Sequence, residues 1–174
     1  MYYLNTRFPT IIFDDYIMDP SIMNNLIEES DEKRIAVIYD YKHYPSECNS
    51  YLNFVRDICS EFLKSNNFEH NKEKWYIDAI RYKLKNVTKR VKSGLAWHCE
   101  NDNGKNLITV LMYMNIDEGV IDGNLRYKDK NNIKKLLNVK SGTTVIMDGK
   151  VPHKPQNPYG SGIRDLLIIS YEKK

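Results

Sequence analysis

Two histidines and one glutamate in this sequence have the residue types and spacing of a metal site. His98 and Glu100 are two positions apart, and His153 comes much later in the chain. In an extended strand, side chains two positions apart point to the same face, so His98 and Glu100 can reach one metal ion. A second histidine alongside them completes the two-histidine, one-carboxylate set that is typical of non-haem Fe(II) oxygenases. Three protein ligands on one side leave room on the metal for a co-substrate and dioxygen.

Asp102 is the alternative to Glu100 as the carboxylate ligand. Its spacing from His98 suits one face of a helix and not a strand, so we prefer Glu100. Cys99, between the two ligands, should point away from the metal. Two other histidines stand in polar N-terminal segments and are interpreted as surface residues: His43 and His70.

Arg164 opens the last apolar strand of the sequence. A positive charge there is costly to bury without an anionic partner. Because a planar guanidinium binds a carboxylate through two parallel hydrogen bonds, Arg164 is a candidate anchor for a carboxylate ligand. The alternative is a structural salt bridge to an acid near Asp165 or to Asp148.

The composition is that of an ordinary globular chain. Its 174 residues are 41% apolar and 11% aromatic, enough for the core of one domain spanning residues 1–174. The 26 basic and 23 acidic residues give a mixed surface with no strong nucleic-acid footprint. The cysteines have no CxxC spacing, which argues against a zinc ribbon or a disulfide framework. No signal peptide or long apolar run occurs, so we expect no membrane contact and a cytoplasmic location.

The N-terminal part, about residues 1–72, is predicted to support the rest of the fold with two strands and two helices. These are a strand at Phe8–Phe13, a helix from Asp19 and Pro20 to about Ser30, a strand at Arg34–Tyr41 and a helix from Ser50 to about Ser65. Asp19 is a good N-cap, and Pro20 suits the first helical position. Cys59 falls on the apolar stripe of the second helix and is interpreted as a core residue.

From Trp75 onward the apolar period becomes strand-like. The predicted strands are Trp75–Leu84, one that begins near Leu95 and delivers His98, Leu107–Met114, Gly123–Tyr127, Lys135–Val139, Thr143–Met147 and Arg164–Tyr171. Leu107–Met114 is almost wholly apolar and should be buried on both faces. Antiparallel strands in two packed sheets predict a cupin-like jelly roll, a double-stranded β-helix, over about residues 75–174. The N-terminal helices should cover one outer sheet face.

A basic stretch, Lys83–Lys92, overlaps a predicted polar hairpin at Lys85–Gly94. One interpretation is a solvated hairpin. The other is a mobile lid whose positive charge meets an acidic or phosphate-bearing substrate at the mouth of the site. The sequence leaves both interpretations open.

Several motifs recur in the order expected of one known superfamily. They are His98-x-Glu100, Leu107-Ile-Thr-Val-Leu-Met-Tyr113-Met-Asn115, Gly123-Asn-Leu125-Arg126, Val151-Pro-His153 and Gly162-Ile-Arg164. Together they resemble the Fe(II)/2-oxoglutarate-dependent dioxygenases, especially the prolyl-4-hydroxylase-like branch. The segment from Pro9 to Ser21 resembles the strand-and-helix entry of that branch, so the similarity covers most of the chain.

The resemblance implies roles for six residues: as metal ligands His98, Glu100 and His153, and as contacts to 2-oxoglutarate Arg164, Tyr113 and Tyr82. For both tyrosines, core packing is the alternative. Three positions depart from the family pattern. Glu100 stands where aspartate is commoner, Asp122-Gly123 where a glycine pair is usual, and Leu166 where many relatives have a small hydroxyl residue.

The resemblance also implies an enzyme that uses Fe(II), 2-oxoglutarate and O2, with ascorbate as a further candidate cofactor. The expected reaction is hydroxylation of a protein or peptide side chain, with proline as the first candidate. A nucleic-acid demethylase is the alternative that the basic stretch favours, but Ser170 stands where that branch tends to carry a further arginine. A non-catalytic jelly-roll binding module is the alternative of a different class.

Overall fold

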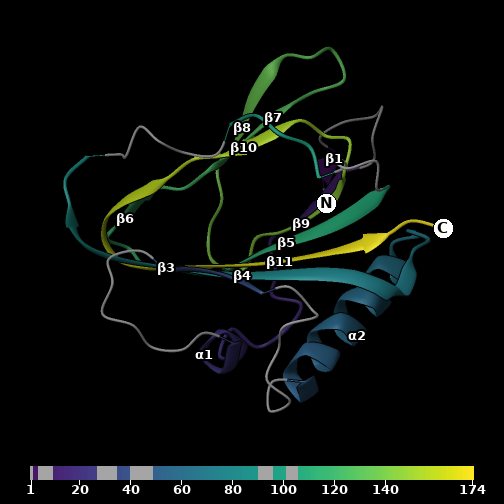
Figure 1. Ribbon diagram of the computed structural model, residues 1–174. Helices are drawn as coiled ribbons and strands as arrows, with labels where there is room; N and C mark the ends of the chain where they lie inside the picture. Colours follow the sequence, from purple (N-terminus) through teal and green to yellow (C-terminus); the bar gives the residue numbers. More distant parts are fainter. Residues whose placement is uncertain (1, 4–9, 27–34, 40–48, 90–95, 101–105) are drawn as a thin grey trace.

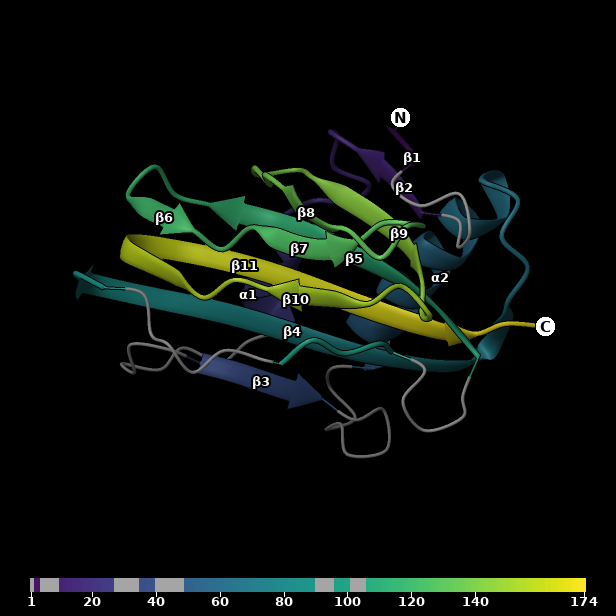
Figure 2. The same cartoon turned by 90° about the horizontal axis from the view of Figure 1, so that it is seen from above.

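Two antiparallel β-sheets face each other in the computed structural model, which describes residues 2–3, 10–26, 35–39, 49–89, 96–100 and 106–174. The helices lie against the outer side of the larger sheet (Figure 1). Seen from above, strands of the smaller sheet lie over the larger one (Figure 2). The predicted mainly β jelly roll with N-terminal helices is confirmed. That the chain forms one domain stays a prediction.

The larger sheet has eight strands among the described residues. Its order is β1 (Tyr2–Tyr3), β2 (Thr10–Phe13), β9 (Thr144–Asp148), β5 (Leu107–Ile116), β11 (Pro158–Glu172), β4 (Asn71–Val87) and β3 (Ile35–Tyr39), and β6 (Val120–Asp122) pairs with one end of β11. The first eight residues of β5 are all buried, as its apolar sequence predicts. The central strands of this sheet therefore carry the core.

The smaller sheet consists of β10 (His153–Pro155), β7 (Leu125–Lys128) and β8 (Lys134–Leu137), in that order. An isolated bridge joins His98 to His153 on β10. The segment 96–100 is thereby held beside this sheet. This backbone pairing brings the two histidines together although they are far apart in the sequence.

The apolar core has two layers, one on each face of the larger sheet. The outer layer packs the sheet against the helices, and the inner layer fills the space between the two sheets. On β5, Val110 and Met112 belong to the outer layer, whereas Leu111 and Tyr113 belong to the inner layer. Because side chains alternate along a strand, a position's parity decides whether it faces the helices or the interior of the jelly roll.

The described part of the chain contains two helices, α1 (Ile22–Leu26) and α2 (Asn49–Ser65). The Asp19 carboxylate accepts a hydrogen bond from the Ser21 amide at 2.8 Å, which supports the predicted N-terminal signal, although the helix itself begins only at Ile22. Helix α2 matches its prediction, and Cys59 is fully buried within the outer layer. No helix in the described part of the chain is long and apolar enough to span a membrane.

The predicted end of β4 at Leu84 is wrong. The strand continues to Val87 because its pairing with β11 extends to Gly160. Residues 85–87 are therefore strand and not hairpin. Lys83 lies on the helix side of the sheet, where it lines a hollow with Arg81 and residues of the α1 region. The lysine thus faces away from the interior, and the end of the basic stretch, residues 90–92, lies outside the described residues.

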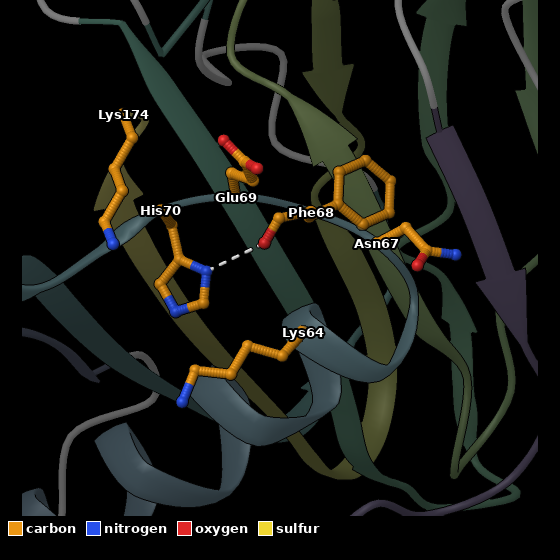
Figure 3. A pocket seen from close by; sticks show the side chains of 6 residues that line it. All are labelled: Lys64, Asn67, Phe68, Glu69, His70 and Lys174. Carbon is orange, nitrogen blue, oxygen red and sulfur yellow. Dashed lines mark hydrogen bonds between the residues drawn. The ribbon is translucent and has the colours of Figure 1, made fainter.

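The interpretation of His70 as a surface residue is also wrong, because only 5% of it is exposed. Its Nδ1 lies 3.0 Å from the Phe68 carbonyl oxygen (Figure 3). Its Nε2 lies 2.8 Å from the Ser60 hydroxyl. A carbonyl only accepts, so Nδ1 carries the proton and Nε2 accepts from Ser60. Both ring nitrogens are used within the protein, which makes His70 a structural residue. His43 lies outside the described residues.

Candidate metal centre

His98 and His153 face each other across a hydrogen-bonded backbone pair. The His98 amide donates to the His153 carbonyl at 3.1 Å, and the His153 amide donates to the His98 carbonyl at 2.9 Å. Directly opposed residues of an antiparallel pair send their side chains to the same side. The two imidazole rings accordingly lie with their centroids 4.3 Å apart. Backbone pairing thus brings two histidines from distant parts of the sequence within reach of one metal.

Glu100 completes this cluster. Its Oε1 lies 3.1 Å from His153 Nε2 and 3.7 Å from His98 Nε2. Ligands about 2.1 Å from a metal and at right angles to one another lie about 3 Å apart, so these separations suit one ion. One donor atom of each residue lies within 4.8 Å of the others. Among the described residues, Glu100 is the carboxylate that meets the two histidines, and Asp102, the alternative, lies outside the described residues.

Backbone carbonyls orient both imidazole rings. His98 Nδ1 lies 2.9 Å from the Ala96 carbonyl oxygen, and His153 Nδ1 lies 3.0 Å from the Val151 carbonyl oxygen. Since a carbonyl cannot donate, each Nδ1 must carry the proton. The Nε2 atom of each ring then faces Glu100. When a ring is protonated, Nε2 can donate to the Glu100 carboxylate, and when it is neutral, Nε2 offers its lone pair to a metal, the arrangement usual for metal-binding histidines. These contacts could not be predicted from the sequence.

The charge of Glu100 is stabilised by the histidines. Burial raises the pKa of Glu100, but the hydrogen bond from His153 and the positive charges that His153 and His98 carry when protonated outweigh burial, and the pKa falls below its ordinary value. The carboxylate is therefore ionised at neutral pH and available to a cation. A cluster of two neutral imidazoles and one carboxylate is a donor set that suits Fe(II).

The predicted strand through His98 is wrong for residues 96–100. Only His98 takes part in β-pairing there, and Glu100 lies in a turn. The turn, and not strand alternation, brings the carboxylate to the histidines. Cys99 lies outside the ligand cluster, as predicted, with its Sγ 3.6 Å from the Lys150 carbonyl oxygen.

Arg164 is 1% exposed and projects into the interior between the sheets. Its Nη2 donates to the Gly123 carbonyl at 2.8 Å, whereas its Nε has no hydrogen-bond partner among the described residues. No described acid forms an ion pair with Arg164, and Asp148, the predicted alternative partner, pairs with Lys173 instead. A buried guanidinium without an anion is costly, so this site fits an anionic ligand.

Gly123 makes room for this arginine. A Cβ at Gly123 would lie 2.7 Å from Arg164 Nε, and the backbone there has φ of +81°. Asp122 also has a positive φ, of 64°. Glycine adopts this conformation without strain and aspartate tolerates it, which explains why a glycine pair and Asp122-Gly123 can serve the same turn.

Two tyrosines flank the guanidinium. The Arg164 Cζ lies 5.1 Å from the ring centroid of Tyr113 and 5.4 Å from that of Tyr82. Burial raises the pKa of the Tyr113 hydroxyl, and the nearby positive charge of Arg164 offsets only part of that shift. Tyr113 therefore stays protonated and able to donate a hydrogen bond. Leu166, at the position where relatives carry a hydroxyl, is buried in the inner apolar layer.

Asp78 is a residue of this site that the sequence reasoning missed. It is half-buried on β4, on the same strand face as Tyr82. Burial raises its pKa to about 6, and the negative charge of Glu100 adds to the shift. Asp78 and Tyr82 are an even number of positions apart, which places them on one face of a strand. This was the only signal in the sequence, and by itself it does not identify a site.

Comparisons with known proteins identify the fold. No family model matches the sequence, and no curated protein matches it. Solved structures do match this chain, at low sequence identity. A prolyl-4-hydroxylase of Pseudomonas putida is 13% identical over 95% of this chain and 92% of its own, with a TM-score of 0.59. An oxidoreductase of the 2OG-Fe(II) oxygenase family from Burkholderia pseudomallei is 13% identical over 95% and 84%, with a TM-score of 0.66.

A third similar structure is a prolyl hydroxylase of Trichoplax adhaerens in complex with a peptide fragment of a hypoxia inducible factor. It is 15% identical over 94% of this chain and 82% of its own, with a TM-score of 0.59. At such low identity these likenesses concern the fold. The chain has the fold of the 2OG-Fe(II) oxygenases, including prolyl hydroxylases.

Proposed function

We propose that this protein is an Fe(II)- and 2-oxoglutarate-dependent oxygenase that hydroxylates a protein or peptide side chain. One observation carries the proposal: a histidine–glutamate–histidine cluster shares the interior of the jelly roll with a buried arginine whose Nε has no partner among the described residues. A ligand trio alone suits several metals and functions. The arginine adds the requirement for an anion, and the fold is one that hosts this chemistry in similar proteins.

The metal would be held by His98 and His153 through Nε2 and by Glu100 through a carboxylate oxygen. The carbonyls of Ala96 and Val151 fix the tautomer in which both Nε2 lone pairs are free to bind. When bound, Fe(II) together with 2-oxoglutarate and O2 supplies an oxidant able to hydroxylate a C–H bond. These chain residues provide the donor atoms and their orientation.

Arg164 would hold the distal carboxylate of 2-oxoglutarate. Its Nε is the buried donor that such a carboxylate would satisfy, while Nη2 stays fixed by the Gly123 carbonyl. The hydroxyls of Tyr113 and Tyr82 are proposed to donate further hydrogen bonds to the co-substrate. Both rings also pack against the guanidinium, so they exclude water from the charge they surround.

The proposed substrate is a protein or peptide side chain, with proline as the first candidate. In support, two of the similar structures are prolyl hydroxylases, and one of these was solved with a peptide. The nucleic-acid alternative depended on the basic stretch. Lys83 at its start lies on the helix side of the sheet, away from the proposed site, and so does not support that alternative.

The test is formation of succinate from 2-oxoglutarate in air, with Fe(II) and ascorbate, in the presence and absence of proline-containing peptides. We expect turnover that requires Fe(II) and rises with peptide. Glu100→Gln should abolish turnover. Glu61→Gln, a matched change at an exposed glutamate on α2, should not affect it. Absence of both turnover and iron binding would refute the proposal, and iron binding without turnover would favour a binding module.

A further inference from the structure

Asp78 occupies a defined position on the interior wall of the jelly roll. It lies on β4, opposite Ile168 of β11. The even-numbered residues of this part of β4 face the inner layer, which includes Ile80 and Ile168. The carboxylate is therefore set among isoleucines, on the same strand face as Tyr82 and near enough to Glu100 for their charges to interact.

No described cation forms an ion pair with this carboxylate. Among the described residues, no hydrogen bond or ion pair involves the side chain of Asp78, and the only charge that shifts its pKa is the negative one of Glu100. Asp78 is also outside the cluster of three residues whose donor atoms lie within 4.8 Å of one another. It is therefore not placed to be a fourth metal ligand.

Charge balance within the site makes Asp78 distinctive. With metal and co-substrate bound as proposed above, the positive charges of Fe(II) and Arg164 equal the negative charges of Glu100 and 2-oxoglutarate. The negative charge of Asp78 then has no counterion in the described part of the chain, in a half-buried, apolar setting. A carboxylate in such a setting is stabilised by a cation that enters from outside the protein.

We infer that Asp78 selects a substrate that carries a positively charged group, an ammonium or a guanidinium, close to the carbon that is hydroxylated. The inference rests on the proposed function and adds to it the charge of the substrate. For a peptide substrate, the charge comes from a lysine or arginine at or next to the target residue. A small amine presents the same chemistry, and the test separates the two sources.

The experiment compares peptides that differ only in charge. One set has a central proline flanked by lysine, norleucine or glutamate, a second has lysine or norleucine at the centre in place of proline, and a third arm uses free lysine and norleucine. The readout is peptide-dependent succinate formation, as kcat/KM. We expect kcat/KM for the lysine peptide to be about ten to a hundred times that for its norleucine counterpart, the range for a hydrogen bond to a charged group.

Variants assign that preference to Asp78. Asp78→Asn should remove most of the difference between lysine and norleucine peptides, and Asp78→Lys should shift the preference toward glutamate. Asp57→Asn, which removes an exposed aspartate of α2, is the matched control and should keep the lysine preference. If Asp78→Lys does not fold, the comparison with Asp78→Asn still decides the question.

The outcomes separate this inference from the proposed function. Binding of 2-oxoglutarate to the Fe(II)-loaded protein, followed without O2 by the visible absorption of the complex, tests the proposed function by itself. If that binding is present but charged and neutral substrates are used equally, the inference is wrong and the proposed function stands. If Asp78→Asn keeps the full lysine preference, another residue selects the charge and the inference is also wrong. Preference for free lysine over the peptides identifies a small-amine substrate.

Discussion

The two faces of the larger sheet each bury an arginine, and the two arginines have opposite surroundings. On the helix side, Arg81 forms a two-pronged ion pair with Asp165, with both distances 2.8 Å, and donates to Asn24 as well. On the interior side, Arg164 has the carbonyl of Gly123 as its hydrogen-bond acceptor, and its Nε has no partner among the described residues.

The difference separates a structural charge from a ligand-binding one. A buried charge whose hydrogen-bonding capacity is used within the protein leaves nothing for a ligand, and removing its partner destabilises the fold. A buried charge with unused capacity costs stability and is ready for a ligand. Asp165 and Asp78 show the same contrast among the acids, since Asp165 is paired with Arg81 and Asp78 has no described partner.

The largest effect should come from removing a ligand on the interior side. His153→Ala should abolish Fe(II) binding and leave the protein folded, because the pairing of position 153 with Tyr127 and with His98 is made by the backbone and remains in the variant. Metal content after reconstitution and circular dichroism measure the two properties. Retained iron would show that His153 is not the second histidine ligand.

Arg81→Ala should lower the free energy of unfolding by about 3–5 kcal/mol, because it leaves the buried carboxylate of Asp165 without its partner. Urea unfolding measures this change. Lys72→Ala breaks an exposed ion pair with Asp57 and should change stability by less than about 1 kcal/mol. Equal effects of the two substitutions would contradict a structural role for Arg81.

Arg164→Ala should weaken 2-oxoglutarate binding by about 2–5 kcal/mol, roughly thirtyfold or more, with a much smaller effect on Fe(II) binding. The reason is that Arg164 contacts the co-substrate and not the metal in the proposed site. Titration of each ligand without O2 separates the two affinities. Equal loss of both would show that Arg164, like Arg81, is structural.

Asp78→Asn should stabilise the metal-free protein at pH 8 and not at pH 4. The pKa of Asp78 is about 6 in the folded protein and 3.8 as the ordinary value, so between these values the folded state binds more protons than the unfolded state. Wild-type stability therefore rises as pH falls through this window. The variant lacks this contribution and should be more stable than wild type by about 2 kcal/mol at pH 8. Chemical unfolding at the two pH values measures the difference, and a constant difference would contradict the raised pKa.

The smallest effect should come from the helix side. Ser60→Ala removes the hydrogen bond to His70 Nε2 and should lower stability by about 1 kcal/mol, with no change in 2-oxoglutarate affinity. Thermal unfolding and ligand titration are the measurements. A change in ligand affinity would show that the two faces of the sheet are not independent.

Local patterns in the sequence determined much of the fold. The apolar run of β5 and the helical stripe of α2 predict elements that the structure contains. Burial of a strand on both faces leaves a continuous apolar run in the sequence, and burial of a helix on one face leaves a helical period. The types of the candidate ligands were also readable, since few residues bind Fe(II). For that reason His98, Glu100 and His153 could be named before their positions were known, and Arg164 could be named because it is a charge within an apolar strand.

Tertiary structure alone decided how these residues meet. The bridge between His98 and His153, the turn at Glu100 and the pairing of β6 with β11 depend on contacts between distant segments, which leave no local period. The burial of His70 depends on its hydrogen bond with Ser60 on α2. The lack of a described ion pair at Asp78 depends on the absence of a basic residue among its described neighbours. The sequence by itself determined which side chains could do chemistry. Long-range strand register decided which of them have unused bonding capacity, and that capacity distinguishes the interior side of the sheet from the helix side.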